Sequence, residues 1–283
     1  MDRLPKYLAV PTMNDITRRR FLLTGFAGIA GLSATGGATV LSAQEASFTG
    51  ERTVEAESIA GDRKGVWTMS LVFRNPRIIS ADIPGRGTKS VWYMWYQVYN
   101  LGKVGPNPVN PKETEVSGDP HVFVPEFELV TLDRRTSHLD EVLPTVLDRT
   151  IRPEVDPNKR LTIHNSISIG RYPIPVTDPR TSLPKKSTGV AIWSDVAERA
   201  GDTNSFAIFI AGLSDGWVPN ATNPNLIQRK TLQLTFQRLG DGRRNDPGEI
   251  SFKSSRWVYR SASLEGAAIV PEPMPKKPDA PKE

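Results

Sequence analysis

Two glutamates, Glu126 and Glu128, are placed where they could serve as a general acid and a general base. They lie two positions apart in the segment HVFVPEFELVT, residues 121–131. On a β-strand, two residues span about 6.6 Å and point to the same face. That distance is close to the carboxyl separation of an inverting glycosidase, roughly 6.5–9.5 Å. The pair is therefore a candidate site for carbohydrate hydrolysis, and the alternative is an ordinary solvated sheet face.

The histidines give a second candidate, a metal site. His121 follows Asp119 by two positions, and His138 precedes Asp140 by two. A metal ion needs two or three donors that converge on it, so Asp119, His121 and His138 would form a composite site only if two loops meet. The sequence has no HxH, HxxxH or HExxH spacing. We therefore expect no metal and no other cofactor, with this composite site as the alternative.

The segment richest in aromatic residues, Val91–Asn100 (VWYMWYQVYN), is a candidate binding surface. The alternation of a strand places Tyr93, Trp95 and Tyr99 on one face and the other aromatic side chains on the opposite face. If the first face is open to solvent, its rings form a stacking platform for sugars or for an apolar patch of a protein partner. If Pro-rich loops such as 170–188 fold over it, the same residues belong to the core.

Apolar and polar residues alternate with a period of two along much of the chain, which predicts β-strands. The segment Thr231–Arg238 places Leu232, Leu234 and Phe236 on one face and polar residues on the other. Further strands are predicted on alternation, or on a run that is apolar on both faces, at 66–73, 77–83, 91–100, 121–131, 161–169, 205–211 and 256–260. Helix signals are weak, with two turns at most at 194–200.

Long Pro- and Gly-rich connections separate these segments, at 102–120, 144–160 and 170–188. Strands of this kind bury one face of a sheet against a second sheet. The pattern therefore predicts a mainly β chain, folded as an antiparallel β-sandwich with long Pro/Gly-rich loops.

An export signal precedes the strands. The motif TRRRFL, Thr17–Leu22, contains the twin arginines Arg18 and Arg19. The run Phe21–Gln44 is uncharged but rich in glycine, so it has the length of a membrane-spanning helix without its hydrophobicity. This combination is typical of a twin-arginine signal peptide. The protein is predicted to be periplasmic or extracellular, anchored to the membrane only if the signal stays uncleaved.

The signal also carries most of the net charge. The whole chain has 36 Lys and Arg against 31 Asp and Glu, and residues 1–43 hold five basic and two acidic residues, which leaves 31 against 29. A protein that binds nucleic acid should carry a concentrated basic field, so this class is excluded. The absence of cysteine fits a protein that folds in the reducing cytoplasm before export. The predicted domains are a signal peptide, 1–43, a spacer, 44–53, a β-sandwich domain, 54–262, and a disordered Pro/Lys-rich tail, 263–283.

The order of four segments, VWYMWYQVYNLGK, FVPEFELVT, GVAIWSDV and FAIFIAGLS, is similar to that in small immunoglobulin-like domains of exported bacterial proteins. The resemblance covers roughly residues 64–260, and the chain as a whole resembles exported proteins of planctomycete-type bacteria. It implies an immunoglobulin-like fold and an envelope location. Its motifs are structural, so it brings no catalytic residues with it.

Together these features favour a non-catalytic envelope protein that binds a protein partner or a cell-wall glycan through a sheet face or loops. One alternative is an extracytoplasmic carbohydrate-active hydrolase that uses the paired carboxylates. The other is a structural scaffold domain without a ligand. The sequence does not decide whether the protein is an enzyme, and the features above favour a protein that is not.

Overall fold

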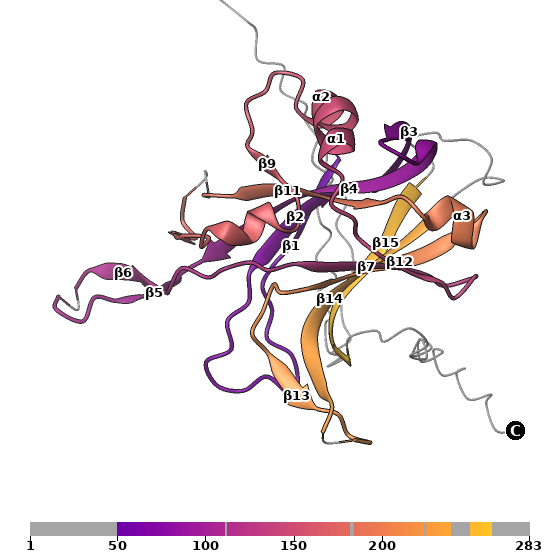
Figure 1. Ribbon diagram of the computed structural model, residues 1–283. Helices are drawn as coiled ribbons and strands as arrows, with labels where there is room; N and C mark the ends of the chain where they lie inside the picture. Colours follow the sequence, from indigo (N-terminus) through magenta and orange to yellow (C-terminus); the bar gives the residue numbers. More distant parts are fainter. Residues whose placement is uncertain (1–49, 111, 182–183, 224, 239–249, 262–283) are drawn as a thin grey trace, which may run out of the picture. The chain divides into compact units, whose positions relative to one another are not determined.

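The structure is a computed structural model that describes residues 50–110, 112–181, 184–223, 225–238 and 250–261 (Figure 1). The predicted signal with Arg18 and Arg19, most of the predicted spacer and the predicted tail lie outside the described residues. Within the described ranges, no helix combines the length and the apolar character that a membrane crossing requires.

The described chain is mainly β with antiparallel sheets, as predicted (Figure 1). The first large sheet is ordered β1-β2-β4-β11-β9, with β3 and β10 also paired to β4. Its strands are β1 (Glu51–Val54), β2 (Ser70–Arg74), β3 (Arg77–Ile83), β4 (Gly87–Leu101), β9 (Ile163–His164), β10 (Val176–Thr177) and β11 (Ser187–Trp193). Two short pairs in it, β10 with β4 and β9 with β11, are parallel.

The second large sheet is ordered β13-β14-β12-β7-β8, with β15 also paired to β14. Its strands are β7 (Glu126–Thr131), β8 (Ser137–Leu139), β12 (Ser205–Ala211), β13 (Trp217–Pro219), β14 (Ile227–Arg238) and β15 (Ile250–Ser261). A separate two-stranded hairpin is formed by β5 (Lys103–Pro106) and β6 (Thr114–Ser117).

One face of each large sheet contributes to a shared core. In β14, Leu232, Leu234 and Phe236 are fully buried, which confirms the predicted alternation. They belong to one apolar cluster with residues of β4 and β12. In this cluster Trp92 meets Phe206 edge to face, with ring centroids 5.2 Å apart. The two sheets therefore share one apolar core from which water is excluded.

The opposite face of β4 is also buried, against helical turns that the sequence analysis did not predict. They follow one another without a break: α1 (Pro144–Val146), the π-helical turn η1 (Leu147–Ile151) and α2 (Arg152–Val155). Val146, Leu147 and Ile151 form a second apolar cluster with Tyr93 and Trp95. The loop predicted for this stretch is therefore wrong, because apolar side chains fold it into turns that cover the sheet.

The strand predicted at 161–169 is wrong except for the two residues of β9. After β9 the chain turns and forms the 3-10 helix η2 (Ser168–Arg171). Asn165 directs this turn, because its side-chain oxygen accepts hydrogen bonds from the backbone amides of Ile167 and Ser168. A local side-chain hydrogen bond therefore overrides the alternation of the sequence.

Two other predictions concern where a helix and a strand begin. The short helix predicted at 194–200 is present as α3 (Val196–Ala200). The spacer predicted at 44–53 overlaps β1, which begins at Glu51 and pairs with β2. The β domain therefore starts a few residues earlier than predicted.

Candidate functional site

The outer face of the second sheet carries the two acids that the sequence singled out. Glu126 and Glu128 lie on β7, and Phe127 between them is fully buried in the core. The prediction that the two carboxylates share one face is therefore confirmed. Their surroundings differ, because the side chain of Glu126 is 57% exposed and that of Glu128 only 7%.

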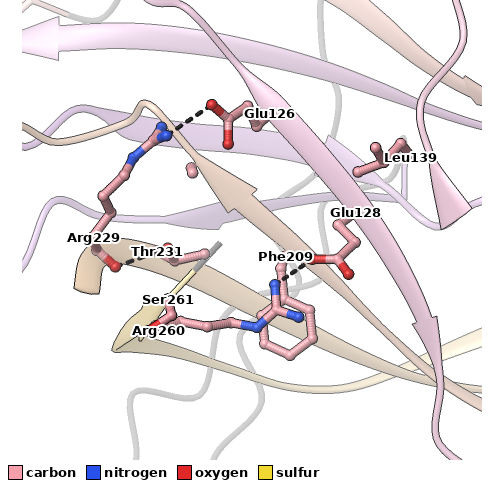
Figure 2. A pocket seen from close by; sticks show the side chains of 9 residues that line it. Glu126, Glu128, Leu139, Phe209, Arg229, Thr231, Arg260 and Ser261 are labelled. Atoms are coloured by element: carbon pink, nitrogen blue, oxygen red, sulfur yellow. Dashed lines mark hydrogen bonds and ion pairs between the residues drawn. The ribbon is translucent and has the colours of Figure 1, made fainter. Parts of the chain in front are cut away.

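Each carboxylate is paired with an arginine from another strand (Figure 2). Nη1 of Arg229 donates to Oε1 of Glu126 at 2.7 Å. Nη1 of Arg260 donates to Oε2 of Glu128, whose Oε1 accepts a hydrogen bond from the hydroxyl of Ser137. Arg229 comes from β14, so its pair with Glu126 reaches across β12, and Arg260 comes from β15, so its pair with Glu128 reaches across both β14 and β12.

The side chains of β12 leave a hollow between these two pairs. Ala211 lies opposite Glu126 in the sheet register, and Phe209 lies opposite Glu128. The guanidinium of Arg260 is placed 4.0 Å from the centroid of the Phe209 ring, which is a cation–π contact. The hollow has a volume of about 200 Å³ and is also lined by Leu139, Thr231 and Ser261 (Figure 2).

This arrangement does not resemble a glycosidase acid–base pair. Such a pair needs one carboxyl group that gives a proton to the substrate and a second that faces the sugar from the other side. Here Glu126 and Glu128 project from one strand and both point toward arginine. The site offers paired donors and acceptors at a surface hollow, which suits hydrogen bonding to a ligand better than proton transfer.

The predicted aromatic platform is not open to solvent. Tyr93 is 1% exposed, Trp95 3% and Tyr99 6%. On this face of β4, Tyr93 and Trp95 share an apolar cluster with residues of α1 and η1. Nζ of Lys186, in the predicted loop 170–188, lies over the Tyr99 ring, 5.7 Å from its centroid. Burial raises the pKa of Tyr93 and of Tyr99, as expected for phenols removed from water. Sugar stacking on these three rings is therefore excluded in this fold.

The candidate metal ligands do not come together. The ring of His121 stacks on Trp67 with centroids 4.2 Å apart, whereas both ring nitrogens of His138 take part in other hydrogen bonds. Asp119 contributes its backbone carbonyl to the side chain of Asn100. In the part of the chain that the structure describes, no group of three His, Asp or Glu side chains could hold a metal ion. The composite site of Asp119, His121 and His138 is therefore wrong.

His138 lies instead in a hydrogen-bond chain that the sequence analysis missed. Its Nδ1 is 2.8 Å from Oδ1 of Asp195, and its Nε2 is 2.8 Å from the hydroxyl of Thr136. The order hydroxyl, imidazole, carboxylate is that of a nucleophile with its general base. However, His138 is fully buried, and the Thr136 hydroxyl also lies 2.8 Å from that of Thr131. Burial lowers the pKa of His138, an effect partly offset by Asp195, and the chain ties β8 to the start of α3.

The pentapeptide GLSDG at Gly212–Gly216 is a second nucleophile-like motif. It matches the GxSxG spacing of a nucleophile elbow, which requires a turn from a strand into a helix. Here it joins β12 to β13 instead. The hydroxyl of Ser214 donates to the carbonyl of Trp67 and accepts from Thr68, so it is fully engaged in holding the loop. The motif therefore has a structural explanation.

Of the sites predicted from the sequence, the face that carries Glu126 and Glu128 is the best candidate, because the hollow over β12 lies there. No protein-family model, curated protein or solved structure matches this chain. The resemblance to exported immunoglobulin-like proteins therefore stays a prediction, and the function has to be inferred from the site itself.

Proposed function

We propose that this chain is an exported, non-catalytic protein of the cell envelope that binds a glycan through the outer face of its second sheet. The observation that carries the proposal is the hollow over β12, framed by the ion pairs Arg229–Glu126 and Arg260–Glu128. The fold proposed for it is an immunoglobulin-like β-sandwich with long Pro/Gly-rich loops. The shared core of the two antiparallel sheets supports that assignment.

Hydrogen bonding, rather than ring stacking, would hold the glycan. The outward side of the Phe209 ring is already covered by Arg260, so it is not free to stack on a sugar. Each arginine has five N–H donors and uses one terminal nitrogen in its ion pair, and each carboxylate can accept several hydrogen bonds. Alternating donors and acceptors of this kind match the neighbouring hydroxyl groups of a sugar.

Export is supported by the twin arginines Arg18 and Arg19 and by the uncharged, glycine-rich run that follows them. Mutation of both arginines to lysine should retain the protein in the cytoplasm. Fractionation of cells that express the two forms measures this. Equal amounts of both forms in the periplasm would contradict export by the twin-arginine route.

Glycan binding can be tested on an array of bacterial polysaccharides and cell-wall fragments. The variant Arg229→Gln should weaken binding about tenfold, because it removes one charge-assisted hydrogen-bond donor from the hollow. The matched control is Arg180→Gln, since Arg180 is a similarly exposed arginine that is ion-paired with Asp178 elsewhere on the surface. No glycan above background, or equal losses in the two variants, would refute the proposal.

The hydrolase alternative makes a different prediction for the same residues. If Glu126 and Glu128 were an acid–base pair, Glu126→Gln and Glu128→Gln would each abolish hydrolysis of a bound glycan. We expect the wild-type protein to release no reducing sugar from any glycan that it binds. Crosslinking to a protein in place of a glycan would move the assignment to a protein partner at the same face.

A further inference from the structure

A second and larger hollow, of about 560 Å³, lies away from the sheet face described above. Four segments border it: the stretch before β7, the stretch after β8, the turn before η2, and η2 itself. The side chains that matter for its chemistry are Val124, Asp140, Val142, Ser166, Ile167 and Arg171. They combine one acid, one base and three apolar groups.

Asp140 is an acid without a cation. Its carboxylate accepts a hydrogen bond from the hydroxyl of Ser166, and no described Lys, Arg or His forms an ion pair with it. Burial raises the pKa of Asp140, and the hydrogen bonds from Ser166 and from backbone amides oppose this. A half-buried carboxylate in this state is stabilised by any positive group that enters the hollow.

Arg171 is the opposite case, a base without an anion. It lies at the end of η2 and is exposed. Its guanidinium makes neither a hydrogen bond nor an ion pair with any residue in the described ranges. Asp140 and Arg171 therefore line the same hollow with opposite charges and do not neutralise each other.

The lining of the same hollow also includes exposed apolar side chains. Val124 is 62% exposed and Ile167 is 66% exposed. Exposed aliphatic side chains next to unpaired charged groups in one concave site are typical of a small-molecule pocket.

We propose that this hollow binds a zwitterion with an apolar side chain, either a free amino acid or the two ends of a short peptide. The ammonium group of the ligand would pair with Asp140, its carboxylate with Arg171, and its side chain would contact Val124 and Ile167. Arg suits a carboxylate because its planar guanidinium can donate two parallel hydrogen bonds to it. This proposal is independent of glycan binding at the sheet face, and either can fail without the other.

The test uses the folded protein and isothermal titration calorimetry with two zwitterionic probes, L-leucine and L-leucyl-L-leucine. We expect at least one of them to bind with a Kd of about 1 mM or tighter. The spacing of the two charged groups decides between them, so the preferred probe identifies the ligand as an amino acid or a peptide. Capping the amine by acetylation, or the carboxylate as an amide, should each weaken binding about tenfold. No binding of either probe up to about 10 mM, or equal binding of the capped forms, would overturn the proposal.

Two variants test which residue pairs with which charged group of the ligand. Arg171→Gln should weaken the zwitterion about tenfold but should leave the amide-capped probe unaffected, because that probe no longer presents a carboxylate. Asp140→Asn should weaken the zwitterion about tenfold but should leave the acetylated probe unaffected, because that probe no longer presents an ammonium group. The matched control is Arg149→Gln, since Arg149 is also exposed and without an ion pair to a described residue. If Asp140→Asn does not fold, the exposed position of Arg171 keeps the test valid, and an unchanged affinity in Arg171→Gln would refute the site.

Discussion

Replacement of Trp95 by alanine tests whether the second face of β4 is core, as the structure has it, or a binding surface. Trp95 is 3% exposed and packs in the cluster that the α1–α2 segment covers. A surface tryptophan could be removed at little cost in stability, whereas a buried one leaves a cavity. The free energy of unfolding therefore separates the two cases.

The expected loss for Trp95→Ala can be worked from its surroundings. Burial of a tryptophan removes at most about 250 Å² from water, and at about 25 cal/mol per Å² this is an upper limit near 6 kcal/mol. Compactness of the unfolded chain lowers this by roughly 10–40%. Loss of the contact with the guanidinium of Arg74, 4.3 Å from the ring, adds about 1 kcal/mol. Removal of the indole N–H, which is buried without a described partner, gives back about 1–3 kcal/mol. The net loss is about 2–5 kcal/mol.

Urea unfolding followed by far-UV circular dichroism measures this change, and the midpoint of thermal unfolding should fall by about 10 °C. The control is Tyr172→Ala, another large aromatic residue, because Tyr172 is 72% exposed and its removal should change stability by less than about 0.5 kcal/mol. A loss below about 1 kcal/mol for Trp95→Ala would refute the burial of this face. It would also restore the aromatic platform as a candidate binding surface.

Three further changes test the polar contacts of the fold. Glu128→Gln should lower the free energy of unfolding by about 2 kcal/mol because its ion pair is largely buried, whereas Glu126→Gln should cost less than about 1 kcal/mol because its pair is exposed; equal losses in urea unfolding would contradict this difference. Burial lowers the pKa of His138, so the unfolded chain binds a proton more readily than the folded one. The free energy of unfolding should therefore fall as the pH drops below about 6.5, and His138→Gln should make it less dependent on pH in this range. Lys230→Met should cost about 3 kcal/mol, because it leaves the carboxylate of Asp62 without its buried cation, and hydrogen exchange should show lost protection around Asp62.

The strands themselves were largely predictable, because period-two alternation depends only on local sequence. The helical cover of β4 was not. Its apolar residues Val146, Leu147 and Ile151 have a helical spacing, but they span barely two turns and lie next to Pro144 and Pro153. Prolines close to such a short pattern are typical of a loop, and in this case Pro144 stands in the first helical turn, where it is tolerated. The tertiary contact with the sheet decides the outcome, and that contact is invisible in one sequence.

Only the two glutamates of the candidate site could be predicted from the sequence, and the two arginines could not. The spacing of Glu126 and Glu128 fixes their common face, but the arginines that pair with them lie 103 and 132 residues further along the chain. Strand order decides which side chains meet across a sheet, and alternation alone does not contain that order. Glu126 and Glu128, which the sequence offers as a catalytic pair, are therefore the ion-pair partners of two arginines from β14 and β15.

The position of these arginines is itself an argument for a ligand at this face. Arg229 and Arg260 are direct cross-strand neighbours in the β14–β15 register, an arrangement of like charges that destabilises a sheet. Glu126 and Glu128 offset this repulsion from β7, although Arg229–Glu126 is an exposed pair of the kind that contributes little to stability. Further along the same two strands, Arg256 lies opposite Gln233 and is bonded to its side chain, with no opposed charge to offset. A sheet face that only needed to be soluble could use such neutral pairs throughout. Arg260 contributes to stability through its largely buried pair with Glu128, whereas Arg229 gains little from its exposed pair. The donors that Arg229 keeps free for a ligand are therefore the physical case for the proposed glycan site.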